Sequence, residues 1–412
     1  MIGEKAILRR AFIFRPLGPL AAFDPGVDAF TGNSMFLEGH RQNTANFGDV
    51  RQSSPLIRFG QLTPAFVLQA VAPLLLIFLG YGAVARETER GTLRPLMLQG
   101  ASARSIVLGK LLALGSVALL IALPALIGFA LIAGQAGAYA GPMATIILAY
   151  AVYLALWVGI VTLVSMLVRR RRDALLALLA IWAVTVVLLP RVAPEIANRA
   201  YPLSNRLQTD VAIARDLRQM GDSHNPDDPH FAAFKKQTLA HYGVTRIEDL
   251  PVNYKGLLAL EGEALSSRLF DRYAARDFAA QASQNALVGA LGLLSSAIAL
   301  RQTSMAAAGT DFEGHRRFLE QAEAYRYDLI QRLNRLQAEA VSYADDTAED
   351  AGADKRKRIT ADHWRKLPEF TFRAAGADTL VRAGLPGLAV LSGWLVVIGV
   401  ALVAATRRLG AR

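Results

Sequence analysis

Long runs of apolar residues dominate the hydrophobic pattern of this chain. A helix needs about 20 apolar residues to cross a hydrocarbon layer about 30 Å thick. Residues 111–168 contain no charged residue and no histidine, and a stretch with Gly134, Gly141 and Pro142 divides them. The pattern predicts an all-α membrane protein with a tight turn at this stretch. Five spanning helices are expected, at residues 59–85, 111–133, 143–168, 174–190 and 383–406.

The basic residues between these segments predict the orientation of the chain. Four arginines stand at 169–172, and short loops rich in Lys and Arg face the cytoplasm in most membrane proteins. Alternation then places residues 86–110, with five basic and two acidic residues, and the basic tail after 406 on the same side. We expect a multi-pass protein of a bacterial inner membrane. In this scheme 59–190 form helices one to four, 383–412 form the last helix and its cytoplasmic tail, and 1–58 and 191–382 lie outside.

The net charge of +11 does not indicate nucleic-acid binding. Residues 191–382 contain 26 basic and 26 acidic residues, so this region is no basic domain of the kind that contacts phosphates. The sequence has no cysteine, which excludes disulfides, Cys-zinc sites and thiol catalysis. We therefore expect a lipid bilayer, and no nucleic acid, as a partner.

The predicted orientation puts the N-terminal region outside, although no apolar segment precedes it. Residues 1–22 lack the apolar stretch and cleavage site of a signal peptide. A wrong gene start, a shortened chain or unaided translocation of 1–58 would each explain this arrangement. We expect that a first spanning helix is missing.

Residues 191–382 carry the signals of a mostly helical domain. Asp228-Pro229 provides an N-cap and a first-turn proline. Thr245 and Thr310 each precede a glutamate by three residues, which is the capping-box spacing. Apolar residues at helical spacing predict a helix over 311–341.

Two further segments of this region have a distinctive composition. The length of the apolar run 287–300 fits a buried or interfacial helix better than a spanning one. If the run did span, the orientation of the last helix would be reversed. The acidic residues of 345–354 and the basic run 355–358 predict a solvated loop, with a contact to lipid headgroups or to a partner as the alternative.

The search for chemistry gives no convincing site. His224, His230 and His241 form the one cluster of histidines, but metal binding needs more ligands at convergent spacing. No P-loop, HExxH or GxSxG motif occurs in a suitable context. The interiors of the predicted spanning helices carry no ionisable residue, which argues against a proton-driven carrier. We expect no catalytic, cofactor-binding or metal-binding residues, and a source of energy outside this chain.

The segment 86–110 is the most informative part of the chain. It predicts a short amphipathic helix that Thr92 caps, that Leu93, Leu96 and Met97 make apolar on one side, and that Gly100 ends. Ser102 is expected to cap the helix that follows.

This segment resembles the permeases of the ABC-2 transporter family. In that family a Glu-rich exit from one spanning helix leads to Gly-Thr-Leu, a short leucine-rich helix, a small residue with Arg, and Gly-Lys. The resemblance continues through the stretches 224–228, 249–253 and 308–311, which look like the subgroup with a large extracytoplasmic domain of unknown function. That subgroup has six helices, one more than the five visible here. The matching residues of the loop are Glu87, Glu89, Gly91, Thr92, Leu93, Arg104, Gly109 and Lys110.

The resemblance implies a partner for the loop. In the family this loop docks on an ABC ATPase subunit, so ATP would bind to that partner chain, and the permease pairs with a second copy or a sister permease. The coupling residues are then expected to be Glu87, Glu89, Gly91, Thr92, Leu93, Leu96, Arg104 and Lys110. Export of an unknown substrate is the family expectation. The alternatives are a sensor or mechanotransmitting subunit that moves no substrate, an ordinary amphipathic connector at 86–110, and a membrane-anchored enzyme.

Overall fold

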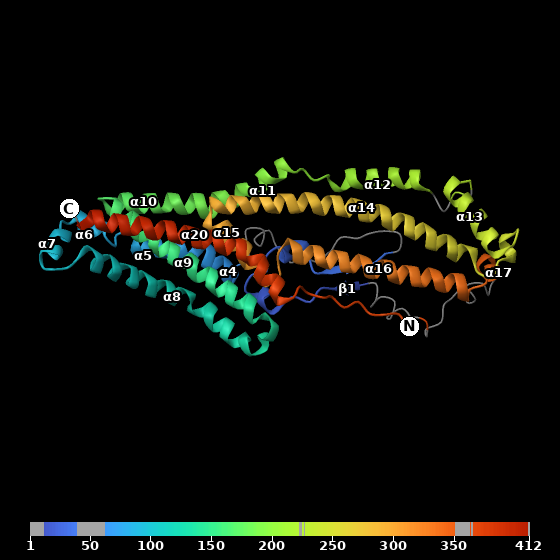
Figure 1. Ribbon diagram of the computed structural model, residues 1–412, viewed down its shortest axis with the longest axis horizontal. Helices are drawn as coiled ribbons and strands as arrows, with labels where there is room; N and C mark the ends of the chain where they lie inside the picture. Colours follow the sequence, from blue (N-terminus) through green and yellow to red (C-terminus); the bar gives the residue numbers. More distant parts are fainter. Residues whose placement is uncertain are drawn as a thin grey trace.

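The computed structural model describes residues 12–38, 62–221, 225, 227–350, 363 and 366–410. Parts of several segments named above lie outside these ranges, namely residues 1–11, 39–61, His224, 351–358 and 411–412. The molecule is elongated, with a bundle of long helices at one end and a second group of helices at the other (Figure 1). We call the two ends of the bundle the loop end, where α6 (Ala85–Glu89) and α7 (Leu93–Leu98) lie, and the domain end.

Among the described residues, five helices are long and apolar enough to cross a membrane, and they coincide with the five predicted segments. The prediction of an all-α membrane protein is confirmed. The first helix comprises α4 (Pro64–Phe66), the π-helical turn η3 (Val67–Val71), α5 (Ala72–Gly80) and, after a turn, α6. The others are α8 (Ala103–Ala136), α9 (Ala140–Leu167), the fourth helix with α10 (Arg171–Trp182), η5 (Ala183–Leu188) and α11 (Leu189–Ala200), and α20 (Ala377–Gly410).

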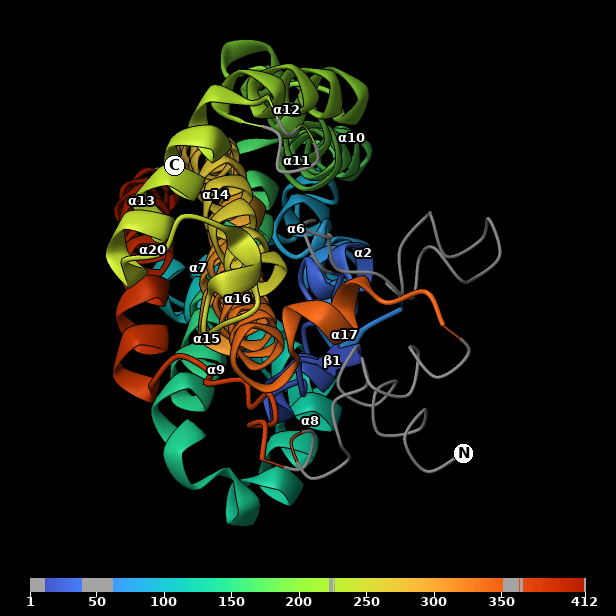
Figure 2. The ribbon, with the colours of Figure 1, turned by 90° about the vertical axis from the view of Figure 1, so that its right-hand side faces the viewer.

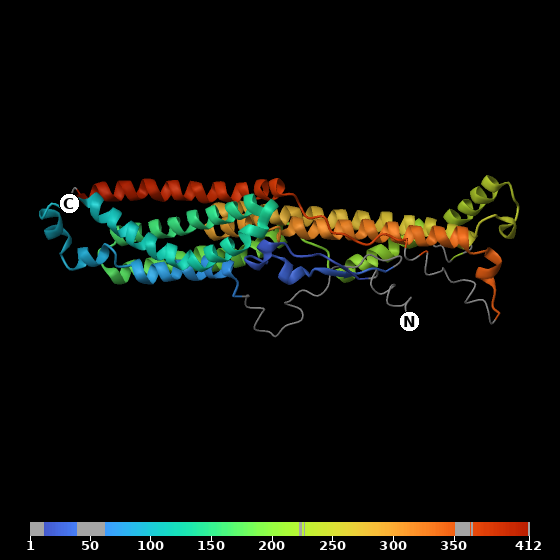
Figure 3. The same ribbon diagram turned by 90° about the horizontal axis from the view of Figure 1, so that it is seen from below.

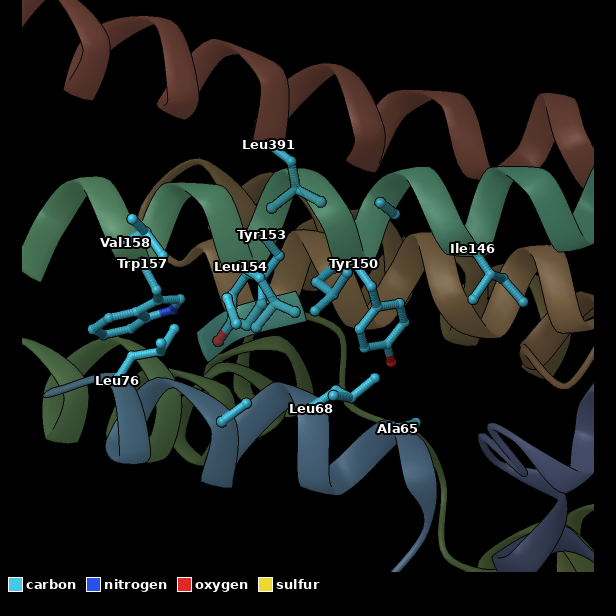
Figure 4. Close-up of a cluster of buried hydrophobic side chains, with 14 of the residues drawn as sticks. Ala65, Leu68, Leu76, Ile146, Tyr150, Tyr153, Leu154, Trp157, Val158 and Leu391 are labelled. Atoms are coloured by element: carbon cyan, nitrogen blue, oxygen red, sulfur yellow. The ribbon is translucent and has the colours of Figure 1, made fainter. Parts of the chain in front are cut away.

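Helix α9 forms the centre of the bundle. It lies between α20 on one side and α4–α5 on the other (Figure 3), and most of its side chains are buried. Tyr153 and Trp157 point from α9 toward α5, whereas Leu391 of α20 closes the opposite side (Figure 4). The hydroxyl of Tyr153 donates a hydrogen bond to the carbonyl of Gln69 at 2.7 Å, so even the polar atom of this buried ring is used within the bundle.

The fourth spanning helix is longer than predicted. The predicted helix ends at Pro190, whereas the structure continues it through Pro190 and Pro194 to Ala200. A proline inside a helix lacks the N–H group, and its ring collides with the carbonyl one turn earlier. The π-helical turn η5 immediately precedes Pro190 and widens the backbone there, and η3 stands in the same relation to Pro73.

Side chains from neighbouring helices bond to the carbonyls of these widened turns. Trp182 donates from Nε1 to the carbonyl of Ala70 in η3, at 3.0 Å. The hydroxyl of Ser295 donates to the carbonyl of Thr185 in η5. In hydrocarbon an unpaired backbone group costs several kcal/mol, so these contacts make the backbone near Pro73 and Pro190 compatible with a membrane.

The apolar run 287–300 forms a hairpin that enters the bundle from the domain end. The prediction of one helix is wrong. The run comprises the end of α14 (Tyr254–Ala290), the 3-10 turn η7 (Leu291–Leu293) and the first part of α15 (Ser296–Ala308). The hydroxyl of Ser295 caps α15 by accepting from the N–H of Ile298. Helix α15 packs on α20, where a Cβ atom on Gly387 would lie 2.5 Å from the carbonyl oxygen of Ala299. Only glycine permits this close approach.

The tip of the hairpin lies level with the middle of the spanning helices. Trp394 donates from Nε1 to the carbonyl of Leu293 at 3.2 Å. Trp394 is 17 residues from Ala377 and 16 from Gly410, about 25 Å from either end of α20. The prediction that the run does not span is confirmed, but the hairpin reaches half-way across, and Leu293 and Leu294 at its tip are exposed and apolar.

Beyond the bundle, α14 and α16 (Phe312–Ala340) form a long antiparallel pair. The predicted helix over 311–341 is confirmed. Helix α12 (Arg206–Met220) lies on one side of this pair, and the short antiparallel strands β1 (Phe12–Phe14) and β2 (Ser34–Phe36) lie on another (Figure 2). Helix α13 (Pro229–Tyr242) and the short α17 (Tyr343–Thr347) lie at the far tip.

The helix caps of this domain confirm some sequence signals and correct others. Asp228 caps α13 as predicted, by accepting from the N–H groups of His230 and Phe231. Thr245 starts no capping box, because the residues after it form only a 3-10 turn, η6 (Ile247–Asp249). At α16 the cap is Asp311 rather than Thr310.

The N-terminal segment holds the corner between α15 and α16, and Thr310 belongs to this contact. Its hydroxyl donates to the carbonyl of Asp24, and its own carbonyl accepts from the N–H of Val27. Arg15 forms two hydrogen bonds with the carboxylate of Asp28 and one with the carbonyl of Gly309. We call these residues the N-terminal clasp. Burial lowers the pKa of the adjacent His315 to about 4, so His315 adds no charge beside Arg15.

A buried charged triad fixes the pairing of α14 with α16. Arg326 of α16 is 1% exposed and donates to Glu263 of α14, which is fully buried, at 2.6 Å. Its other nitrogen atoms bond to Glu323 on its own helix. Removal of one member of such a triad strongly destabilises the folded protein, because it leaves an uncompensated charge in the interior.

We predict that Arg326→Ala destabilises the protein by about 3–5 kcal/mol, because Glu263 loses its buried counter-charge. The matched control is Arg332→Ala on the same helix, whose pair with Asp328 is half exposed and is worth less than about 1 kcal/mol. Unfolding of both variants in detergent measures the difference. Equal stability of the two variants would refute the importance of the triad.

Candidate functional site

The loop between the first two spanning helices is anchored in the bundle by one serine. The N–H groups of Val84 and Ala85, at the start of α6, donate to the hydroxyl of Ser165 on α9 at 2.9 and 3.0 Å. Ser165 is fully buried. Ser165 was not among the predicted site residues, although a serine near the end of an apolar spanning helix is a signal that could have pointed to it.

Helix α7 is anchored on one side and exposed on the other. Leu93 is buried in a cluster with Val107, Met166 and Leu409, and Met97 packs against it. Leu96 was predicted on the same apolar side, but it is exposed, and Leu98 is 85% exposed. The apolar residues of α7 therefore divide into an anchor, Leu93 and Met97, and an exposed pair, Leu96 and Leu98.

The ends of α7 follow the predicted turn chemistry only in part. Gly100 has a φ of +93°, and the N–H groups of Gly100 and Ala101 bond to the carbonyls of Met97 and Leu96. This pattern is a Schellman motif, so the predicted stop is confirmed. Ser102 caps α8 by accepting from Ser105, also as predicted. Thr92 is no acceptor at the start of α7, because its hydroxyl donates to Glu87 instead.

The acidic residues of the loop contact neighbouring helices. Glu87 accepts from Thr92 at 2.6 Å and lies 3.6 Å from Nζ of Lys110 on α8. Glu89 accepts from the N–H of Arg171 at the start of α10, at 3.2 Å, and its carboxylate also lies 3.8 Å from Nε of that residue. The structure thus brings Glu87, Thr92 and Lys110 together. Arg171 was not predicted as a partner of the loop.

The remaining predicted loop residues lie at the surface. Gly91 is exposed with a φ of +70°, which favours glycine at the turn between α6 and α7. Arg104 is exposed in the first turn of α8. Both residues are exposed, so they are available for contact with another molecule.

The histidines form no metal site among the described residues. His230 bonds to Glu261 at 3.0 Å, whereas His241 is exposed. In the described part of the chain no group of three or more His, Cys, Asp or Glu side chains converges as metal ligands.

Comparison with known protein families assigns both parts of the chain. Residues 21–227 match the family described as ABC-2 family transporter protein, and this range includes the loop and four spanning helices. The chain belongs to the ABC-2 transporter family. Residues 206–373 match a domain of unknown function, DUF3526. No curated protein and no solved structure matches the chain.

Membership of the ABC-2 family confirms the resemblance seen in the loop and in the following domain. The chain is a multi-pass membrane protein and a permease-type membrane subunit. The family implies an ABC ATPase as partner. The DUF3526 range covers α12, α13, α14, α15 and α16, so the hairpin that enters the bundle belongs to that domain.

We predict that Ser165→Ala detaches the loop, because two buried N–H groups lose their acceptor, at about 1–3 kcal/mol for each group. Hydrogen exchange of residues 84–98 should then accelerate tenfold or more. The control is Ser116→Ala on α8, whose hydroxyl bonds only to carbonyls of its own helix. Unchanged exchange in the Ser165 variant would show that the loop is held by other contacts.

Proposed function

We propose that this chain is the permease subunit of an ATP-driven exporter and that α7 receives a separate ATPase subunit. The observation that carries the proposal is the exposed pair Leu96 and Leu98 on α7. Figure 1 places α7 at the extreme loop end, beyond the ends of the neighbouring spanning helices. Exposed leucines at such a position are typical of a surface that another protein covers.

The contacts of the loop provide a path from the ATPase to the bundle. Ser165 connects the start of α6 to α9, Lys110 connects Glu87 to α8, and Arg171 connects Glu89 to α10. A partner that moves α7 would therefore displace three spanning helices together. This rigid attachment supports a coupling role over that of an ordinary connector.

We infer that the loop end faces the cytoplasm of a bacterium and that the DUF3526 domain lies outside the inner membrane. The inference rests on charge, because the arginines at 169–172 and the basic residues of the loop all lie at the loop end. It agrees with the need of an ATPase subunit for cytoplasmic ATP. In this orientation substrate would leave on the side of the DUF3526 domain.

We propose that a second permease subunit packs against an apolar stripe on the fourth spanning helix. Val184, Leu188, Val192 and Ile196 are exposed at four-residue intervals along it. Exposed Leu207 and Val211 follow on α12, beyond the end of the spanning helix. The helix has 30 residues, about 45 Å, so its outer part extends past the ~30 Å hydrocarbon core and lipid does not cover it.

We predict that Leu98→Glu reduces binding of the ATPase subunit at least tenfold, because a charge replaces an apolar contact at the centre of the interface. The test co-expresses the chain with an ABC ATPase subunit that co-purifies with the unmodified chain, and measures co-purification and ATP hydrolysis. The control is Leu62→Glu, an equally exposed leucine at the domain end. Full ATPase stimulation by the Leu98 variant would contradict docking at α7.

The same assay separates two roles of the acidic residues. Glu87→Lys and Glu89→Lys are expected to uncouple ATP hydrolysis from the permease. If Glu87 acts through Lys110, the double variant Glu87→Lys with Lys110→Glu restores the ion pair and the stimulation. If Glu87 contacts the ATPase directly, the double variant stays uncoupled.

A further inference from the structure

An elongated cavity of about 580 Å³ lies between α8 and α9. Small residues on the facing sides of the two helices create the space, and longer apolar side chains complete the walls. The small residues include Gly115, Ala118 and Ala122 on α8 and Ala151 and Ala155 on α9. Small residues on facing helices usually bring them into close contact in membranes, whereas here α8 and α9 leave a gap.

The lining of this cavity is almost entirely carbon. Tyr150 is the one lining residue with a polar side-chain atom, and its hydroxyl is bonded to Gln69 and to Ser304. Water in such a cavity would have no partner for its own hydrogen bonds, and apolar cavities of this kind stay dry or take apolar molecules. The chemistry of the walls therefore selects an apolar occupant.

The cavity is long and partly open. The lining residues on α8 run from Leu111 to Phe129, about 27 Å along the helix axis. The space is long and narrow, as an alkyl chain requires, and its volume is in the range of small-ligand sites, about 300–1,000 Å³.

Aromatic rings close the domain end of the cavity. Phe23, from the N-terminal segment, packs against Phe129 of α8 at 4.7 Å and against the edge of Tyr150 of α9 at 5.1 Å between ring centroids. The adjacent Asp24 accepts from the hydroxyl of Ser304 on α15. The N-terminal clasp therefore holds Phe23 in place.

We propose that this cavity binds one acyl chain of a membrane phospholipid, which enters sideways from the bilayer. Both walls are spanning helices, and the outer face of α8 beside the cavity carries exposed leucines such as Leu112 and Leu120. The medium next to the cavity is thus the hydrocarbon of the membrane. Phe23 stops the chain from passing toward the DUF3526 domain. The binding site does not depend on ATP-driven transport.

The test uses the full chain in vesicles of phosphatidylethanolamine and phosphatidylglycerol, with a photoreactive diazirine near the end of one acyl chain of the phosphatidylethanolamine. After illumination, mass spectrometry locates the labelled residues. Gly115→Phe fills the cavity, because a Cβ atom at Gly115 meets no atom within 4 Å. Gly128→Phe is the matched control, since Gly128 is equally open, on the same helix, and does not line the cavity.

We expect the wild-type chain to be labelled at residues 147–158 of α9, on the inner wall. Gly115→Phe should reduce this labelling at least fivefold, whereas Gly128→Phe should leave it unchanged. Ala155→Leu, a smaller change on the opposite wall, should reduce the labelling partly. This variant takes the place of Gly115→Phe in the test if Gly115→Phe fails to fold. Absence of label on the inner wall, or labelling that neither filling variant reduces, would overturn the proposal.

Discussion

The structure depends on one constraint, that every backbone polar group at the level of the membrane has to find a partner within the protein. Prolines at 73 and 190 interrupt two spanning helices, and the hairpin turn at Leu291–Leu293 places non-helical backbone half-way along the bundle. The carbonyls concerned accept hydrogen bonds from side chains on other elements. The donors are Tyr153, Trp182, Ser295 and Trp394.

These bonds also connect parts of the molecule that are far apart in the sequence. Ser295 and Leu293 join the DUF3526 domain to η5 and α20 at the middle of the bundle, and the N-terminal clasp joins the same domain to the region around Phe23. At the loop end Ser165 connects α6 to α9. The central helix α9 therefore contacts both the loop and, through α15, the outer domain. A displacement at one end of the molecule would change the contacts at the other end.

Features that depend on the composition of many consecutive residues could be predicted from the sequence. Twenty apolar residues identify a spanning helix regardless of its neighbours, and the Gly100 stop and the Ser102 cap are local backbone requirements. Predictions that depend on the bonding partner of a particular side chain or turn were less successful. Pro190 was a reasonable end for the fourth helix, because the sequence does not show that η5 and Ser295 compensate for it. Thr92 and Thr310 were predicted as caps but donate to Glu87 and to Asp24 instead.

The hairpin that enters the bundle is the central feature of this account, and its depth can be measured directly. The chain has no cysteine, so Leu293→Cys introduces one site for a spin label. In phospholipid vesicles its collisions with oxygen and with a water-soluble nickel complex are compared with those of Val396→Cys in the middle of α20 and of Lys236→Cys in α13. The account predicts that Leu293 matches Val396, with high access to oxygen and little to nickel. Access to nickel equal to that of Lys236 would contradict it.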